Sequence, residues 1–151
     1  MKSHILALDL GTNTGFCIGK EKRGVPDYSG TQSFAPRRFD GGGMRYLRFR
    51  QWLDEVVKDS RIGRVVFEEV RAHKGVDASH VYGGLLATLT AWCEEQGLPY
   101  EGIGVGAIKK HATGKGNANK EAMIEACRAL GYDPVDDNEA DAIHLYRYVT
   151  Q

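Results

Sequence analysis

Acidic side chains stand in apolar surroundings at three places in the chain. Asp9 interrupts an apolar run near the N-terminus, Glu68 and Glu69 end a second such run, and Asp141 lies near the start of the last predicted helix. An ionised carboxylate is costly in such surroundings unless it is paired or binds a cation. Clustered carboxylates would favour a hard divalent cation such as Mg²⁺. Two such ions, about 4 Å apart, can activate water and stabilise the leaving oxygen in phosphodiester cleavage.

Each acid also has a structural interpretation when it is taken alone. Asp9 can cap a turn, Glu69 can be a solvated strand end, and Asp137 can cap the last helix. The cost of burying several charges disfavours that interpretation for Asp9, Glu68 and Asp141 together. Side chains alternate along a strand, so only one of Glu68 and Glu69 can share a face with Asp9.

A basic segment separates the second and third acids. Residues 105–120 contain no acid and carry four lysines and one histidine, namely Lys109, Lys110, Lys115, Lys120 and His111. Such a segment is suited to following a phosphate backbone, although a solvated loop and helix start would look the same. Three further candidates for DNA contact follow the Glu68–Glu69 pair, namely Arg71, His73 and Lys74.

A second basic cluster has a single acid, Asp40, among five arginines, namely Arg37, Arg38, Arg45, Arg48 and Arg50. We expect most of these arginines to face water, which is the usual environment of a guanidinium group.

Composition limits the class of protein. The chain has 151 residues, 42% of them hydrophobic and 26% charged, which predicts one globular domain over residues 1–151. Its 20 basic and 20 acidic residues cancel, which argues against a uniformly basic surface but not against a basic face. Three dispersed cysteines argue against disulfides or structural zinc. No stretch approaches the roughly 20 consecutive apolar residues that cross a bilayer, so no membrane contact is expected and we predict a cytoplasmic protein.

Apolar periodicity predicts the elements that must position these residues. Strands are expected at 5–10, 16–19, 28–34, 64–70 and 98–105, and a loop at 35–43. Helices are expected at 44–58, around the stripe 82–93, from an N-cap at Asn119 through 130, and at 138–148. This order predicts an α/β domain with a mixed sheet.

The motifs together carry a resemblance to a known family. The order Leu-Asp9-Leu-Gly-Thr-Asn-Thr-Gly, Val-Val-Phe-Glu68-Glu-Val and Glu-Ala-Asp141-Ala-Ile resembles the RuvC family of Holliday-junction resolvases, and more narrowly its small phage-type or bacterial members. The resemblance covers nearly the whole chain and is weakest from Glu21 to Gly43. It implies a ribonuclease H-like fold with a mixed five-stranded sheet flanked by helices. It also implies a homodimer that incises four-way DNA junctions with Mg²⁺, for which Mn²⁺ substitutes.

The resemblance also implies a ligand set. Asp9, Glu68 and Asp141 would be the metal-binding carboxylates, and the family places a fourth ligand three residues before the last aspartate. This chain has Asn138 there. Asn138 would bind weakly through its amide oxygen, or Asp137 would take the role; Glu139 is a poorer substitute because it points to the other side of the helix. The predicted catalytic and metal-binding set is therefore Asp9, Glu68, Asp137 and Asp141.

Three other functions remain open at this stage. The asparagine at position 138 is consistent with a domain that binds nucleic acid or a protein without cutting. An RNA-strand-specific nuclease would use the same fold. Residues 9–15 also resemble the phosphate-binding turn of sugar-kinase and actin-like ATPases, which share the ribonuclease H-like core. Those enzymes close two such domains over a nucleotide, and 151 residues supply one.

Overall fold

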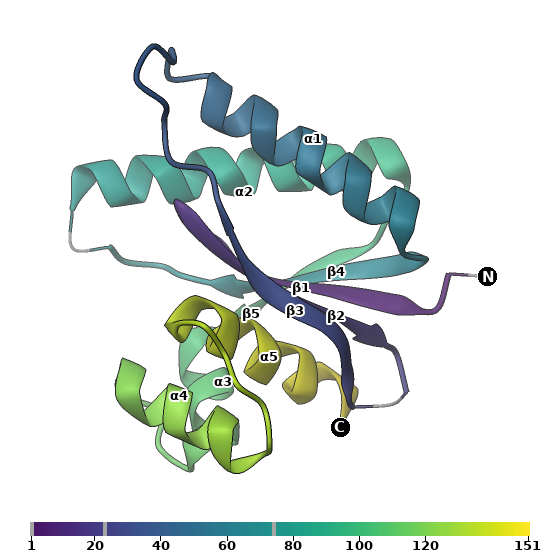
Figure 1. The fold of residues 1–151 in the computed structure, drawn as a ribbon, viewed down its shortest axis with the longest axis vertical. Helices are drawn as coiled ribbons and strands as arrows, with labels where there is room; N and C mark the ends of the chain where they lie inside the picture. The colour runs from purple at the N-terminus through teal and green to yellow at the C-terminus, as the bar shows by residue number, and fades with distance from the viewer. Residues whose placement is uncertain (1, 23, 74) are drawn as a thin grey trace.

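A five-stranded sheet with helices on both faces forms the centre of the computed structural model, which describes residues 2–22, 24–73 and 75–151 (Figure 1). The strands are β1 (His4–Asp9), β2 (Asn13–Lys20), β3 (Pro26–Ser33), β4 (Ile62–Glu69) and β5 (Tyr100–Gly104). The helices are α1 (Met44–Asp59), α2 (Val76–Gln96), α3 (Val105–Thr113), α4 (Lys120–Ala129) and α5 (Asp137–Thr150). The mixed α/β fold predicted from the sequence is confirmed.

The sheet has the strand order β3-β2-β1-β4-β5. Its first three strands form an antiparallel meander, whereas β4 pairs parallel with β1 and β5 pairs parallel with β4. Parallel neighbours need long crossover connections, and α1 and α2 provide them. Because β1 and β4 run side by side in the same direction, their carboxyl ends meet at one edge of the molecule.

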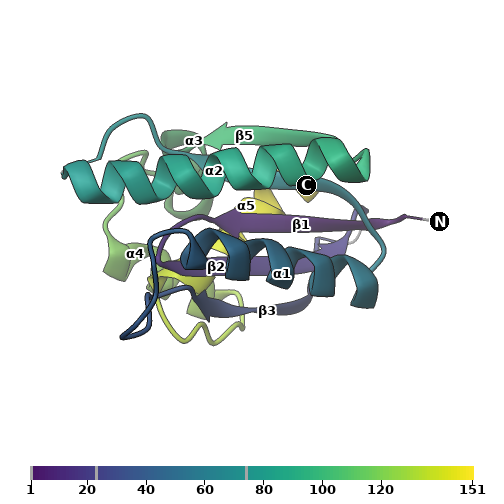
Figure 2. The ribbon, with the colours of Figure 1, turned by 90° about the horizontal axis from the view of Figure 1, so that it is seen from above.

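The alternation of side chains divides the interior into two cores. On β1, Leu6 and Leu8 pack in the core beneath α1 and α2, whereas Ile5 and Ala7 pack in the core beneath α5. The two crossover helices lie next to each other across one face of the sheet (Figure 2), and α3, α4 and α5 cover the other (Figure 1). Even-numbered residues of β1 therefore face α1 and α2, and odd-numbered residues face α5.

The C-terminal half differs from expectation in one element. The predicted strand 98–105 ends at Gly104, and Val105 begins α3, which the periodicity did not indicate. The reason is that α3 buries only Ile108, and no side chain caps its N-terminus. Asn119 caps α4 as predicted, since its Oδ1 accepts a hydrogen bond from the Ala122 amide at 2.9 Å.

Among the described residues, no helix combines the length and the apolar character that a bilayer requires.

Candidate metal centre

Asp9 and Glu68 end neighbouring strands and share the face that α5 covers. Asp9 follows Ile5 and Ala7 in the alternation of β1, and Glu68 follows Val66 in that of β4, all three of which belong to the core beneath α5. The parallel register pairs Leu8 with Phe67, so Asp9 and Glu68 are adjacent at the next step. Glu69 is on the opposite face. The alternation of side chains alone left Glu68 and Glu69 open, and the sheet places Glu68 on the face of Asp9.

Helix α5 brings the third acid to this edge because it lies unusually close to β2. Gly15, the partner of Asp9 across the β1–β2 pair, faces the first turn of α5. A Cβ built on Gly15 would lie 1.8 Å from the backbone oxygen of Asn138. This close approach places Asp141 over the strand ends, and one carboxylate oxygen each from Asp9, Glu68 and Asp141 lies within 4.8 Å of the others.

Two hydroxyl groups of β3 fix the start of α5. Thr31 Oγ1 donates to Asp136 Oδ1 at 2.7 Å, and the same oxygen caps the helix by accepting from the Glu139 amide at 2.9 Å. Ser29 Oγ donates to Glu139 Oε2 at 2.7 Å, and the Val135 amide donates to Glu139 Oε1 at 2.9 Å. Both oxygens of Glu139 are therefore engaged away from the acid cluster, and Glu139 is not placed to be its fourth ligand.

Burial and mutual repulsion make the cluster costly in the absence of a cation. Desolvation raises the pKa of Asp9 well above its ordinary value, and the charges of Glu68 and Asp141 raise it further. Desolvation, with repulsion from Glu68 and Asp137, raises the pKa of Asp141 to about 7. The pKa of Glu68 is also raised, again chiefly by burial. A bound cation would offset this cost and favour the ionised form of all three carboxylates.

One atom in the cluster lacks a partner altogether. Among the described residues, Asp141 Oδ1 is buried and has no hydrogen-bond donor within reach. A buried unsatisfied oxygen ordinarily costs about 1–3 kcal/mol, so its position beside two other carboxylates calls for a positive partner. Oxygen donors of this type and number fit a hard cation that retains several waters. The acid triad can therefore hold a metal ion.

Asp137 lies one helical turn before Asp141 and close to the triad without belonging to it. Its charge contributes to the raised pKa values of Asp9, Glu68 and Asp141. Its carboxylate also lies 3.9 Å from Lys120 Nζ. The backbone of Asn138 faces Gly15. The candidates for a fourth metal ligand were Asp137, Asn138 and Glu139. Of these, Asp137 is the one whose charge acts on the triad.

The predicted basic segment lies beside the acids. Lys109, on α3, is close enough for its charge to lower the pKa values of Glu68 and Asp141. Lys110 and Lys115 are exposed, and Lys120 begins α4 with its side chain 78% exposed. The unpredicted α3 therefore separates the four lysines into one next to the carboxylates and three on the surface.

The residues that follow β4 are less uniform than the sequence suggested. Arg71 is exposed, whereas the His73 ring is partly buried against Tyr82 with 4.9 Å between centroids. Lys74, also predicted to contact DNA, lies outside the described residues. Of the two described residues, Arg71 is thus fully available to a ligand and His73 only in part.

Tyr82, the first residue of the predicted apolar stripe 82–93, also has a role near the acids. Its hydroxyl donates to the Glu68 carbonyl oxygen at 2.9 Å and accepts from the Val70 amide at 3.1 Å. These two bonds hold the end of β4, where Glu68 projects. The apolar stripe of α2 predicted burial of the ring, but no sequence signal indicated where the hydroxyl would bind.

A cavity of about 580 Å³ adjoins this edge of the sheet. It is bounded by the turn after Asp9 (Leu10, Gly11 and Thr12), by Arg45 of α1, and by the start of α2 with His73. The triad itself does not line it. The cavity therefore extends the candidate site from the strand ends toward α1.

Comparison with known proteins gives structural matches only. No protein-family model matches the chain, and no curated protein matches its sequence. The Thermus thermophilus RuvC bound to a Holliday junction substrate matches with a TM-score of 0.80 and 20% identity, over 97% of this chain and 92% of that chain. A second T. thermophilus RuvC structure gives 0.76 and 21% over 96% and 92%.

The yeast mitochondrial Holliday junction resolvase Ydc2 is more distant in sequence. It matches with a TM-score of 0.70 and 11% identity, over 99% of this chain and 78% of that chain. Together these matches establish the ribonuclease H-like α/β fold of the Holliday-junction resolvases over nearly the whole chain. At such identities they speak to the fold and not to the activity.

Proposed function

We propose that residues 1–151 form a single nuclease domain that hydrolyses phosphodiester bonds in four-way DNA junctions or other branched DNA. The observation that carries this proposal is a cluster of three largely desolvated carboxylates, one of which keeps a buried oxygen, Asp141 Oδ1, without a hydrogen-bond partner. The fold shared with Holliday-junction resolvases supports it and directs attention to branched DNA.

Asp9, Glu68 and Asp141 would hold the metal, with Asp137 as a further ligand. Bound Mg²⁺, or Mn²⁺ in its place, would supply Lewis-acid stabilisation and an activated water for two-metal hydrolysis. The chain's own part is to fix the carboxylates. The strand ends position Asp9 and Glu68, and Tyr82 holds the backbone at Glu68. The hydrogen bonds from β3 to the start of α5 position Asp141.

The lysines beside the acids would bind the substrate. Lys110, Lys115 and Lys120 are exposed around α3 and α4, where they would neutralise phosphates on either side of the cleaved bond. Arg71, His73 and Lys74, which follow β4 in the chain, would also contact DNA. Lys109, nearest to Glu68 and Asp141, would contact the phosphate closest to the metal.

The domain would act as a homodimer. A two-fold axis places two sites on two strands of a branched junction, which is the arrangement that symmetrical resolution needs. Sedimentation velocity of the protein with and without a four-way junction tests this directly. A complex containing one protein chain per junction would contradict it.

The test of cleavage is a gel assay on synthetic four-way DNA in Mg²⁺. Asp141→Asn should bind the junction and fail to cut it, whereas Asp133→Asn, with its side chain 95% exposed, should cut as the parent does. Cleavage by Asp141→Asn at the parental rate would refute the mechanism. A panel with linear duplex, nicked DNA and an RNA–DNA hybrid separates junction cleavage from RNA-strand cleavage.

A second candidate is a domain that binds branched DNA without cutting it. Asn138, which stands where the resembled family has an acid or histidine, favours this alternative. Binding of Mg²⁺ with no incision of any substrate in the panel would support it. Incision that requires Asp9 would exclude it.

A further inference from the structure

The loop between β3 and α1 presents an aromatic side chain to solvent. Phe39 is 90% exposed, more than any other large apolar side chain among the described residues. The Arg38 guanidinium lies over the Phe39 ring, with Cζ 5.3 Å from its centroid. An exposed ring gains nothing from the protein core. Apart from the contact with Arg38, the Phe39 ring is therefore open to a partner from outside the chain.

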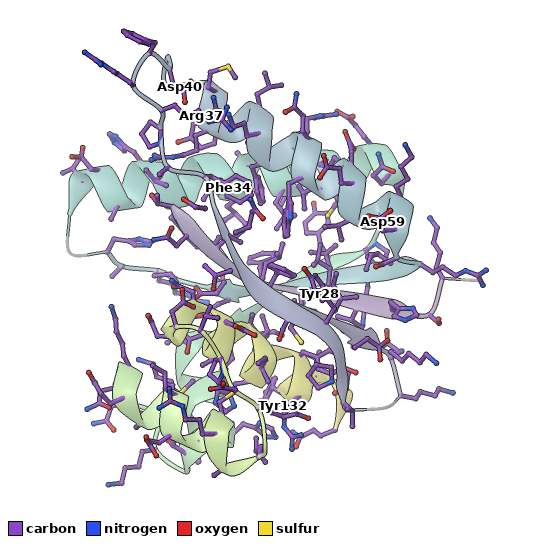
Figure 3. The ribbon with its side chains drawn as sticks, viewed as in Figure 1. Tyr28, Phe34, Arg37, Asp40, Asp59 and Tyr132 are labelled. Carbon is purple, nitrogen blue, oxygen red and sulfur yellow. The ribbon has the colours of Figure 1, made fainter. Side chains whose placement is uncertain are left out.

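The turn that carries Phe39 is closed at both ends. The Asp40 amide donates to the Arg37 carbonyl at 3.0 Å, and the Arg37 amide donates to Asp40 Oδ2 at 2.7 Å. Arg48 of α1 donates to both oxygens of the same carboxylate, from Nη1 to Oδ2 at 2.5 Å and from Nη2 to Oδ1 at 2.8 Å. Arg38 and Phe39 are thus the two tip residues of a turn anchored to α1. Figure 3 shows Arg37 and Asp40 on the loop that extends past the start of that helix.

The base of the loop is tied to the turn that follows Asp9. Phe34 is buried against Phe49, with ring centroids 5.3 Å apart, and its amide donates to the Thr12 carbonyl at 2.7 Å. Arg45 Nε donates to the Phe34 carbonyl at 3.1 Å. The tip therefore stands on the same framework as the acid triad, which gives it a fixed position relative to the site.

The surroundings of the tip suit nucleic acid. The loop lies at the same end of the molecule as the N-terminal ends of α2 and α4 (Figures 1 and 2). The cavity of about 580 Å³ lies between the turn after Asp9 and the start of α2, with Arg45 of α1, which also holds the Phe34 carbonyl at the base of the loop, on its wall. Asp40, the only acid in residues 37–50, is paired with Arg48, so the tip itself is cationic through Arg37 and Arg38.

We propose that the Arg37–Asp40 turn is a stacking wedge that engages unpaired or unstacked bases of the branched DNA. Phe39 stacks on a base, because every base offers a π-face, while Arg37 and Arg38 contact the flanking phosphates. Continuous duplex offers the ring no open base face. The wedge therefore adds affinity for the branch point and not for linear DNA. This inference rests on the proposed function, since it assumes a branched DNA substrate.

The experiment measures binding separately from cleavage. In an Asp141→Asn background with Mg²⁺, dissociation constants are measured for a four-way junction and for a linear duplex of the same sequence. Phe39→Ala should weaken junction binding about 5- to 140-fold, as expected for one stacked base, and leave duplex binding within about twofold. Phe39→Trp should retain junction affinity. Val25→Ala, a matched control that is 51% exposed in the β2–β3 turn, should bind as the parent does.

The outcomes separate this inference from the proposed function. Junction binding by the parent together with unchanged binding by Phe39→Ala overturns the wedge alone. An equal loss on junction and duplex, or an equal loss in Val25→Ala, also overturns it. A change in the oligomeric state of Phe39→Ala by sedimentation would assign Phe39 to a protein contact instead. Absence of junction binding by the parent refutes the proposed function and the wedge with it.

Discussion

Replacing Gly15 with alanine tests whether the approach of α5 to β2 builds the acid cluster. The new Cβ would lie 1.8 Å from the Asn138 oxygen and 2.3 Å from its carbonyl carbon, both of them backbone atoms. An ordinary contact is about 3.5 Å, so the first turn of α5 must retreat by more than about 1 Å. Asp141, one turn further along, would move away from Asp9 and Glu68 with it.

The expected cost falls on activity and on stability. Misplacing a catalytic group by about 1 Å costs on the order of 100-fold in rate, and overpacking of this kind costs about 1–3 kcal/mol. Cleavage of a four-way junction under single-turnover conditions gives the rate, and urea unfolding gives the stability. We expect Gly15→Ala to fold, to cut about 100-fold more slowly, and to need more Mg²⁺ for half-maximal rate.

Gly83 provides the matched control for this substitution. It lies on α2, and a Cβ built there meets nothing within 4 Å. Gly83→Ala should cut at the parental rate and gain up to about 1 kcal/mol from helix propensity. If Gly15→Ala retained both the parental rate and the parental stability, the account of how α5 positions Asp141 would be wrong.

Three further substitutions test other parts of the site. Asp141→Asn should stabilise the metal-free protein, because it removes a charge that the fold disfavours. The pKa of Asp141 is raised from 3.8 to about 7, which corresponds to about 4 kcal/mol against the ionised carboxylate in the folded state. Parental stability should therefore fall as pH rises from 4 to 7, and thermal unfolding should show a larger gain for Asp141→Asn at pH 8 than at pH 5. Tyr82→Phe, which leaves the Glu68 carbonyl and Val70 amide without the hydroxyl, should cost about 1–3 kcal/mol in urea and slow cleavage; the exposed Tyr100→Phe should do neither. Lys109→Ala should flatten the log–log salt dependence of junction binding by about one, and an unchanged slope would remove Lys109 from the DNA contacts.

The sequence indicated which acids would gather but not how they would be selected. Asp9 and Glu68 could be proposed because charge inside an apolar strand is costly. The choice of Glu68 over Glu69 depends on which face α5 covers, and that is a property of the assembled sheet. Tyr82 illustrates the same limit, because its ring was predictable from the apolar stripe and its hydroxyl bonds were not.

Helix α3 was not predicted because its sequence carries only weak helix signals. Helix α3 buries a single residue, Ile108, and follows a strand directly without a side-chain cap. Its lysines were predicted as a segment suited to phosphates, but their division between the acid cluster and the surface follows from the helix. The proximity of Gly15 to Asn138 is likewise tertiary, since residues so far apart in the chain carry no mutual signal.

The position of α5 in the chain has a consequence for biosynthesis. The ribosome releases β1 and β4, with Asp9 and Glu68, before Asp141 is made, so a nascent chain can pair its strands while the acid triad is incomplete. Helix α5 also covers Ile5, Ala7 and Val66, and these side chains stay open to solvent or chaperones until it docks. Completion of the acid triad and closure of the second core thus become one late folding event.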